Sequence, residues 1–260
     1  MLNVSIIIVS FNGREHLGRC LQSLHDAPPS RSHEIIVVDN SSTDGSADVV
    51  RRWPGVRLIE NDTNLGFAAA NNVGIRASAG EYLLLLNSDT IVPAGAVDTL
   101  AAALDRDPTV AIVGPRLVNT EGRAELSVGR MVGPWNEFRQ KYLMPDRAEQ
   151  LERQEQFPDW VSGACLLVRR GDAEAVGGLD ERFFMYLEDV DFCAAIRARG
   201  RRVLFTPGVE VTHLRGGSRT SAEAATARAY RRSQLAFYRK HHPSWAPLLR
   251  LYHRLRSADT

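Results

Sequence analysis

Three acidic residues stand together at the predicted start of a helix, directly after an aromatic run. Glu188, Asp189 and Asp191 follow residues 183–187, which read Phe-Phe-Met-Tyr-Leu. A helix N-terminus favours acidic side chains through its dipole, but the dipole does not explain the aromatic residues before them. An apolar pocket would raise the pKa of such a carboxyl and suit it to take a proton, whereas the dipole would lower it. The pattern indicates a candidate general base and leaves open which effect prevails.

Polar side chains also follow three apolar runs that are typical of buried strands. They are Ser10 and Asn12 after the first run, Asp39 after the second, and Asn87, Ser88 and Asp89 after the fourth. In open parallel sheets, ligands bind outside the carboxyl ends of the strands. Asp39 is suited to accept hydrogen bonds from a nucleobase or ribose, or to cap the following helix. Asp89 is suited to hold Mg²⁺ on a diphosphate, or to form a turn.

A histidine closes a later strand-like run. His213 follows residues 209–212 and precedes Gly216 and Gly217, with Arg215 and Arg219 on either side of the glycines. Imidazole ligates metals, and guanidinium groups bind phosphate. A single histidine at a strand end is more often structural, so both interpretations stay open at this point.

The elements that position these residues alternate between strands and helices. Short apolar, β-branched runs over residues 4–9, 34–39, 56–60 and 82–86 predict buried strands. Helical patterns over residues 13–26, 43–53 and 67–78 connect them. This alternation predicts an α/β fold with a doubly wound, mainly parallel sheet.

The second half of the chain is less regular. We expect a helix from residue 93 to 105, strands over 110–114, 164–168, 202–205 and 209–212, and helices over 188–199 and 221–241. Residues 116–159 are polar and contain glycine and proline, which indicates an excursion over the active face.

Composition limits the classes of function. The 260 residues carry a formal net charge of +1 and are 44% hydrophobic, which gives no overall field for nucleic acid and predicts a full core. Neither lysine, Lys141 nor Lys240, follows a glycine-rich turn, so no P-loop is present. No G-x-G-x-x-G follows the first strand, which argues against a dehydrogenase-type dinucleotide site. The three scattered cysteines, Cys20, Cys165 and Cys193, indicate core residues of a reducing compartment.

The N-terminus and the hydropathy predict a cytoplasmic protein. The chain starts with a strand-like run and no basic leader, and no apolar run approaches the ~20 residues that span a bilayer. Peripheral contact with the inner face of the plasma membrane stays open.

Taken together, these runs resemble the family 2 glycosyltransferases of the GT-A fold, in that family's order over residues 4–218. The matching segments are residues 4–12, 37–46, 64–72, 86–89, 160–164 and 188–191, together with His213. The resemblance implies a single domain with a mixed, mainly parallel sheet and a C-terminal helical extension. Asn87 stands where the family's metal motif often begins with aspartate, and this departure resembles the rhamnosyltransferase-like branch.

The resemblance also implies roles for individual residues. Asp189 would be the general base, with Glu188 beside it, in a metal-dependent, inverting transfer. Asp89 and His213 would hold Mg²⁺ or Mn²⁺ on the donor diphosphate. Trp160 and Gly163 would lie on the acceptor side. The donor site would contain Ser10, Asn12, Asp39, Asn64, Gly66, Phe67, Asn87 and Ser88.

The implied partners are a nucleotide diphosphate sugar and a hydroxyl of a glycan or lipid-linked acceptor in polysaccharide or cell-wall biosynthesis. The branch favours dTDP-L-rhamnose as the donor, with a UDP-hexose or UDP-furanose as the alternative. Two remote alternatives are a nucleotidyltransferase, which would need a lysine-bearing glycine-rich loop after the first strand, and a non-catalytic sugar-nucleotide-binding protein. The second would need no acidic cluster at residues 188–191.

We divide the chain into a nucleotide-sugar-binding half (1–115), an acceptor-binding and catalytic half (116–218) and a basic helical extension (219–260). Residues 230–260 carry seven Lys/Arg residues and one acid, Asp259. In helical geometry Leu248, Leu251, Tyr252 and Leu255 share one face. Such a helix suits an anionic membrane surface, and equally a packed surface or a homodimer.

Overall fold

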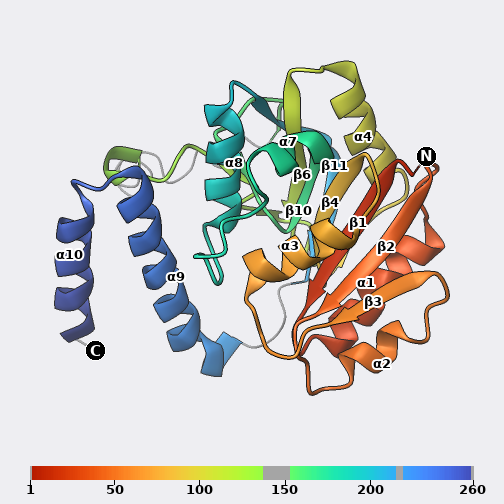
Figure 1. The fold of residues 1–260 in the computed structure, drawn as a ribbon, viewed down its shortest axis with the longest axis horizontal. Helices are drawn as coiled ribbons and strands as arrows, with labels where there is room; N and C mark the ends of the chain where they lie inside the picture. The colour runs from red at the N-terminus through yellow and green to blue at the C-terminus, as the bar shows by residue number, and fades with distance from the viewer. Residues whose placement is uncertain (1, 137–152, 215–218, 259–260) are drawn as a thin grey trace.

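Apolar residues on both faces of the central strands form a sheet that is covered by helices on either side (Figure 1). The structure is a computed structural model that describes residues 2–136, 153–214 and 219–258. Its strands are β1 (Val4–Ser10), β2 (His33–Asp39), β3 (Val56–Glu60), β4 (Tyr82–Asn87), β5 (Thr90–Ile91), β6 (Val110–Val118), β7 (Ala124–Glu125), β8 (Val128–Gly129), β9 (Trp160–Val161), β10 (Cys165–Arg169) and β11 (Arg202–His213). The helices are α1 (Arg14–Asp26), α2 (Ser46–Val50), α3 (Phe67–Ala77), α4 (Ala96–Arg106), α7 (Arg170–Ala175), α8 (Glu188–Ala198), α9 (Arg219–His241) and α10 (Ala246–Ala258).

The main sheet has the order β3-β2-β1-β4-β10-β6-β11-β5, with β7 paired to β6. Strands β1 to β4 are parallel, β10 runs antiparallel to β4 and β6, and β11 runs parallel to β6. In the parallel register Ser10 lies opposite Asp39, and Val9 lies opposite Asn87. The predicted mixed, mainly parallel sheet is therefore confirmed, and the carboxyl ends of β1, β2 and β4 meet at one edge.

Alternation along the buried strands divides the core between two faces. Ile6 and Ile8 of β1 belong to a cluster with the buried residues of α1 and α4. Ile7 belongs to a second cluster, which includes residues of α3 and α8. Successive side chains along a strand point to opposite faces of the sheet, so apolar residues lie on both faces and helices bury them on both sides.

The helix predicted over residues 43–53 is shorter, because the backbone N–H groups before α2 donate to side chains at the ends of β1 and β2. The backbone N–H of Thr43 donates to Asn12 Oδ1 at 2.8 Å, and that of Ser42 donates to Asp39 Oδ2 at 2.9 Å. Gly45 has a φ of 84°, a left-handed conformation that begins α2 one residue later. The prediction was wrong for residues 43–45 and for 51–53, which form turns.

Two other predictions change in the second half. The two strands expected over 202–205 and 209–212 form the single strand β11, with a register shift between Thr206 and Glu210. The strand expected to end at residue 114 continues as β6 to Val118, because it pairs with both β11 and β7. Within the expected excursion, residues 137–152 lie outside the described residues.

The C-terminal helices α9 and α10 lie outside the sheet and the helices that cover it (Figure 1), and a buried ionic contact joins α9 to α8. Asp191 of α8 is 1% exposed and accepts hydrogen bonds from Lys240 Nζ at 2.8 Å and from His241 Nε2 at 2.7 Å, both on α9. Helix α10 then lies against α9. Across the described ranges, no helix combines the length and hydropathy needed to cross a membrane. The three cysteines are buried and free.

Candidate active site

Unpaired polar atoms mark the carboxyl ends of three neighbouring strands. Ser10 Oγ, Asp39 Oδ1 and Asn87 Oδ1 are buried and find no hydrogen-bond partner among the described residues. Leaving such an atom unpaired costs about 1–3 kcal/mol. Ser88 Oγ joins the group, because a Cβ placed on Gly13 would lie 3.6 Å from it and 3.7 Å from Ser10 Oγ. Three predicted donor-site residues thus carry polar atoms without a partner at this edge, and Ser88 lies beside Ser10, an arrangement that suits a polar ligand.

Strained backbone surrounds the same edge. Asn12, Ser41, Tyr186 and Leu187 have positive φ values of 49°, 68°, 72° and 67°, and they are the non-glycine residues with this conformation in the described chain. Each such conformation costs about 1–3 kcal/mol and persists where the surroundings enforce it. Two of them follow β1 and β2, and the other two immediately precede Glu188. The strain therefore points to the strand ends and to the start of α8 as the functional region.

Asn40 holds the loop that carries the predicted donor residues Asn64 and Gly66. Its Oδ1 accepts from Asn61 Nδ2 at 3.1 Å and from the backbone N–H of Leu65 at 3.0 Å. Its Nδ2 donates to Asn64 Oδ1 at 2.8 Å and to the carbonyl of Gly66 at 3.3 Å. Asn40 has no separate role in the sequence-based interpretation. The three asparagines at positions 40, 61 and 64 were the signal that could have identified it.

The acidic pair at the start of α8 lies in two different environments. Asp189 is half-buried, and its Oδ2 accepts a 2.8 Å hydrogen bond from the N–H of Gly163. Burial raises the pKa of Asp189 above its ordinary 3.8, although the N–H groups of Gly163 and Val190 lower it. Burial, and then the charge of Asp189, raise the pKa of Glu188 well above 4.5, and its Oε2 has no partner among the described residues. Burial therefore outweighs the helix dipole. The N–H groups of Gly163 and Val190 favour the charged form of Asp189, and Oε2 of Glu188 has no such donor among the described residues.

A tight seam connects the donor loop to the loop before Asp189. The N–H of Phe67 donates to the carbonyl of Phe184 at 2.7 Å. Gly66 has a φ of 82°, and a Cβ there would lie 2.4 Å from the Phe184 carbonyl oxygen. At Gly163, an added Cβ would lie 3.1 Å from Asp189 Cβ and 3.6 Å from Phe67 Cε1. The loop of Asn64 and Gly66 and the loop of residues 184–187, here named the donor loop and the catalytic loop for their predicted roles, thus converge with the β9–β10 loop within van der Waals distance.

The predicted metal-site residues form a contact at the other side of the β4 end. His213 Nε2 lies 3.2 Å from Asp89 Oδ1, and Asn87 Nδ2 lies 3.5 Å from the same nitrogen. His213 Nδ1 lies 2.9 Å from Glu125 Oε2. Burial lowers the pKa of His213, but the hydrogen bonds and charges of Asp89 and Glu125 outweigh it and raise the pKa above 6.5.

Glu125 was missed by the sequence interpretation because it lies in a segment without a motif. The pairing of β7 with β6 carries it to His213. A carboxylate on the far nitrogen of a histidine fixes the ring for metal binding. No group of three or more histidine, cysteine or acidic residues forms a complete metal cage in the described ranges. One carboxylate and one imidazole fit a cation whose other ligands are donor phosphates and water.

The two acceptor-side residues differ in what the structure shows. Gly163 is in place beside Asp189, and the N–H of Asn87 donates to the neighbouring Ala164 carbonyl at 2.9 Å. Trp160 instead packs: its indole N–H donates to the Arg130 carbonyl at 2.9 Å, and a Cβ on Gly129 would lie 2.5 Å from its ring. The acceptor-side roles of both residues stay predictions.

Comparisons with known proteins find a matching family and named relatives. The sequence pattern of the family described as "Glycosyl transferase family 2" matches residues 5–176. The chain is 33% identical to an N-acetylglucosaminyl-diphospho-decaprenol L-rhamnosyltransferase of Mycobacterium tuberculosis, over 94% of this chain and 87% of that protein. It is 25% identical to the rhamnosyltransferase WbbL of Escherichia coli, over 81% of this chain and 83% of that protein.

Solved structures confirm the fold. The mannosyltransferase PcManGT from Pyrobaculum calidifontis, solved in complex with GDP-Man and Mn²⁺, superposes with a TM-score of 0.66 at 22% identity, covering 95% of this chain and 68% of that one. The predicted GT-A fold is therefore correct. Because the family's sequence pattern spans most of the chain and a relative at 33% identity covers nearly all of it, the protein belongs to glycosyl transferase family 2.

Proposed function

We propose that this glycosyltransferase moves L-rhamnose from dTDP-L-rhamnose to a hydroxyl of a lipid-linked glycan acceptor, with inversion at the anomeric carbon. The names of the M. tuberculosis and E. coli relatives support rhamnose as the sugar, and the former supports a diphospho-polyprenol acceptor. The single observation that carries the proposal is that a candidate donor site and a candidate base lie next to each other. Unpaired polar atoms line the strand ends, and a half-buried carboxylate of raised pKa stands across the Gly163 loop from them.

The donor nucleotide lies over the strand ends in this proposal. Asp39 accepts hydrogen bonds from the base or ribose through Oδ1, since Oδ2 is already engaged by Ser42. The hydroxyls of Ser10 and Ser88 and the amide of Asn87 face the same space. Asn40 and Gly66 hold the donor loop in place without touching the reacting atoms.

Asp189 performs the proton transfer. Its carboxylate takes the proton of the acceptor hydroxyl while that oxygen forms a bond to the anomeric carbon. The bond from this carbon to the diphosphate oxygen breaks at the same time, so a single displacement inverts the centre. The N–H of Gly163 holds the carboxylate in position, and Glu188 keeps its own proton beside it. A positioned base of this kind contributes about 10²–10⁴-fold in rate.

Asp89 and His213 would hold Mg²⁺ or Mn²⁺ against the donor diphosphate, with Glu125 orienting the imidazole. A divalent cation at this position neutralises the charge that develops on the leaving diphosphate. The division into a donor half (1–115) and an acceptor half (116–218) belongs to the same proposal.

Calorimetric titration tests the donor. We would titrate dTDP-L-rhamnose, UDP-glucose and UDP-galactose, each with and without Mg²⁺ or Mn²⁺. The proposal expects metal-dependent binding of dTDP-L-rhamnose, and metal-independent binding in Asp89→Asn. Asp39→Asn should weaken donor binding by about 10–100-fold, the loss of a hydrogen bond to a charged group. The control Asp26→Asn changes an exposed acid at the end of α1, outside the donor loop, and should change nothing. Binding of a UDP-sugar alone would remove rhamnose from the proposal.

A further inference from the structure

One side of helix α9 follows the segment that leads to Asp189. Positions 230, 233, 237 and 240 recur at intervals of three, four and three residues, which places them on the same side of the helix. Each lies against a residue of the segment 180–191, which contains the catalytic loop and Asp189. The four pairs are Tyr230 with Tyr186, Ser233 with Met185, Phe237 with Phe183, and Lys240 with Asp180. The positions rise along α9 while their partners fall along the segment, so the two run antiparallel and in register.

A buried hydroxyl and an aromatic pair hold the middle of the segment. Ser233 is 4% exposed, and its Oγ donates to the Met185 carbonyl at 2.7 Å. The rings of Tyr230 and Tyr186 lie 6.1 Å apart, centroid to centroid, a distance at which aromatic pairs attract each other. Since the hydroxyl is buried, its removal would leave the Met185 carbonyl without this partner.

Lys240 joins the two ends of the segment. Its Nζ donates to Asp180 Oδ2 at 2.7 Å and to Asp191 Oδ2 at 2.8 Å. These acids stand on either side of the catalytic loop and Asp189 in the chain, and Asp191 is 1% exposed. Hydrogen bonds between charged groups are shorter and stronger than those between neutral groups. One ammonium group thus fixes the separation between the start of the segment and the first turn of α8.

The catalytic loop needs such support because its backbone is strained. Tyr186 and Leu187 have φ values of 72° and 67°, and non-glycine residues keep this conformation only where their surroundings enforce it. Ser233 binds the carbonyl directly before this pair. Leu187 is buried in one cluster with Phe183 and Phe237, whose rings lie 6.5 Å apart. Contacts of α9 therefore supply part of what enforces the strained conformation.

We infer that Ser233 and Lys240 are positioning residues, through which α9 holds the catalytic loop and with it the carboxylate of Asp189. They act through the loop and not on the substrate. The inference rests on the proposed function, because that proposal makes Asp189 the base. It assigns α9 to the active site, whereas the sequence-based division placed this helix in a separate basic extension.

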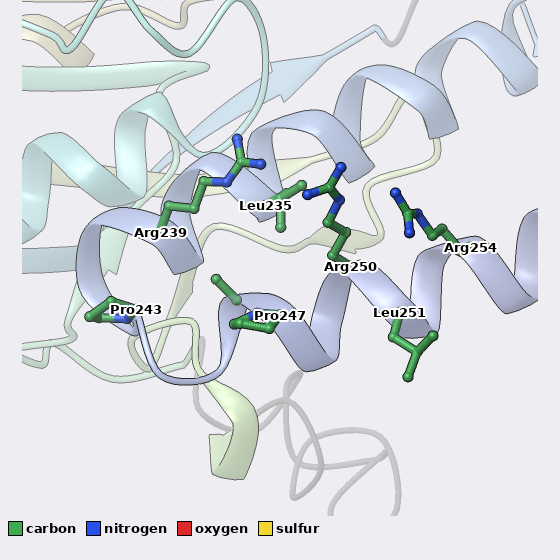
Figure 2. A pocket seen from close by; sticks show the side chains of 8 residues that line it. Leu235, Arg239, Pro243, Pro247, Arg250, Leu251 and Arg254 are labelled. Carbon is green, nitrogen blue, oxygen red and sulfur yellow. The ribbon is translucent and has the colours of Figure 1, made fainter.

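Another side of α9 faces α10 and provides matched controls. Arg239 lines a groove between the two helices (Figure 2). Gln234 Oε1 lies 2.9 Å from His253 Nε2 of α10. Gln234→Ala therefore removes a hydrogen bond from the position next to Ser233, and Arg239→Met removes a positive charge from the position next to Lys240.

Hydrogen exchange of the full chain, followed by mass spectrometry on peptides that cover residues 180–191, measures the support without any substrate. Ser233→Ala loses one hydrogen bond, so exchange there should rise by about tenfold. Lys240→Met loses two charge-assisted bonds and should raise it by about 100-fold. Gln234→Ala and Arg239→Met should each change it by less than about threefold. Where Lys240→Met does not fold, the milder Ser233→Ala still decides the test.

Turnover shows whether the support reaches the base. Ser233→Ala should lose about tenfold in kcat, less than the ~10²-fold that a 1 Å displacement of a catalytic group costs, while calorimetric donor binding is kept. A residue that acts through Asp189 has nothing to act on in Asp189→Asn. Adding Ser233→Ala to Asp189→Asn should therefore lower the residual turnover by less than about threefold, whereas a merely structural role would lower it by about tenfold again.

Three kinds of result overturn the inference. They are exchange at the wild-type rate in Ser233→Ala, an equal loss of turnover in Gln234→Ala, and the same loss of turnover from Ser233→Ala with and without Asp189→Asn. Near-normal turnover in Asp189→Asn alone refutes the proposed base instead. Because the exchange measurement uses no substrate, it then still decides whether α9 holds the segment, so the two failures are distinguishable.

Discussion

Replacing Gly66 with alanine tests whether the donor loop positions the catalytic loop. The residue has a φ of 82° and a ψ of 175°, a region that only glycine adopts readily. A Cβ there would lie 2.4 Å from the carbonyl oxygen of Phe184 and 2.6 Å from its Cδ2. Since the carbonyl is backbone, no side-chain rotation relieves the contact. The loop that leads to Asp189 has to move.

The size of that movement follows from the contact. An ordinary van der Waals approach needs the Phe184 carbonyl to retreat by about 1 Å, and a displacement of that size at catalytic groups costs about 10²-fold in rate. The backbone strain adds about 1–3 kcal/mol of destabilisation. We therefore expect Gly66→Ala to fold with a lowered melting temperature and to lose about 10²-fold in turnover.

A matched glycine separates the two effects. Gly55 has a φ of 85°, but nothing lies within 4 Å of a Cβ placed on it. Gly55→Ala should therefore lose stability without losing turnover. Thermal melting and initial rates at saturating donor, measured on both variants, are sufficient. If Gly66→Ala keeps turnover within about threefold of the wild type, a 1 Å shift at Phe184 does not reach the chemistry and the reasoning is refuted.

Three more predictions concern the acids of α8. Asp189→Asn should reduce turnover by about 10²–10⁴-fold, while donor binding measured by calorimetry survives. Wild-type turnover should fall on acidification through the raised pKa of Asp189. Near-normal turnover in the variant would place the base elsewhere. Burial raises the pKa of Glu188 in the folded state, so the folded state loses stability as the pH rises above about 4.5 and through that raised pKa. Glutamine does not titrate. The melting temperature of Glu188→Gln should therefore exceed that of the wild type by an amount that grows over this pH range. A constant difference would show that Glu188 does not titrate there. Asp191→Asn should lower the free energy of unfolding in urea by about 3 kcal/mol, the lower end of the range for a broken buried pair, because Lys240 and His241 stay partly exposed. No change would mean that α9 does not depend on this contact.

The sequence predicted the parts of the site that follow a strand. Asp39, Asn87 and Asp89 come directly after apolar runs. Parallel pairing of these strands brings their carboxyl ends to one edge of the sheet, and this does not depend on the second half of the chain. The same logic predicted the sheet. The acids at 188 and 189 were identified because an aromatic run precedes them, although only the structure shows that burial outweighs the helix dipole.

The rest depends on contacts between distant segments, for which the sequence has no local signal. Glu125 reaches His213 because a two-residue strand pairs with β6, and nothing in the neighbouring sequence distinguishes it from the other acids of the chain. Asp191 belongs to the predicted acidic cluster but binds Lys240 and His241, some 50 residues away. The helix predicted from residue 43 begins late, because side chains of the strand ends compete for its first N–H groups.

The most direct test of the proposed function is the transfer reaction itself. Purified protein would be incubated with dTDP-L-rhamnose, Mg²⁺ and an N-acetylglucosaminyl-diphospho-polyprenol acceptor, and the lipid fraction would be followed by mass spectrometry for wild type and Asp189→Asn in parallel. The proposal predicts an acceptor that gains one rhamnose with the wild type and stays unmodified over the same time with the variant. Equal product from both proteins, or modification only when another nucleotide sugar replaces dTDP-L-rhamnose, would contradict it.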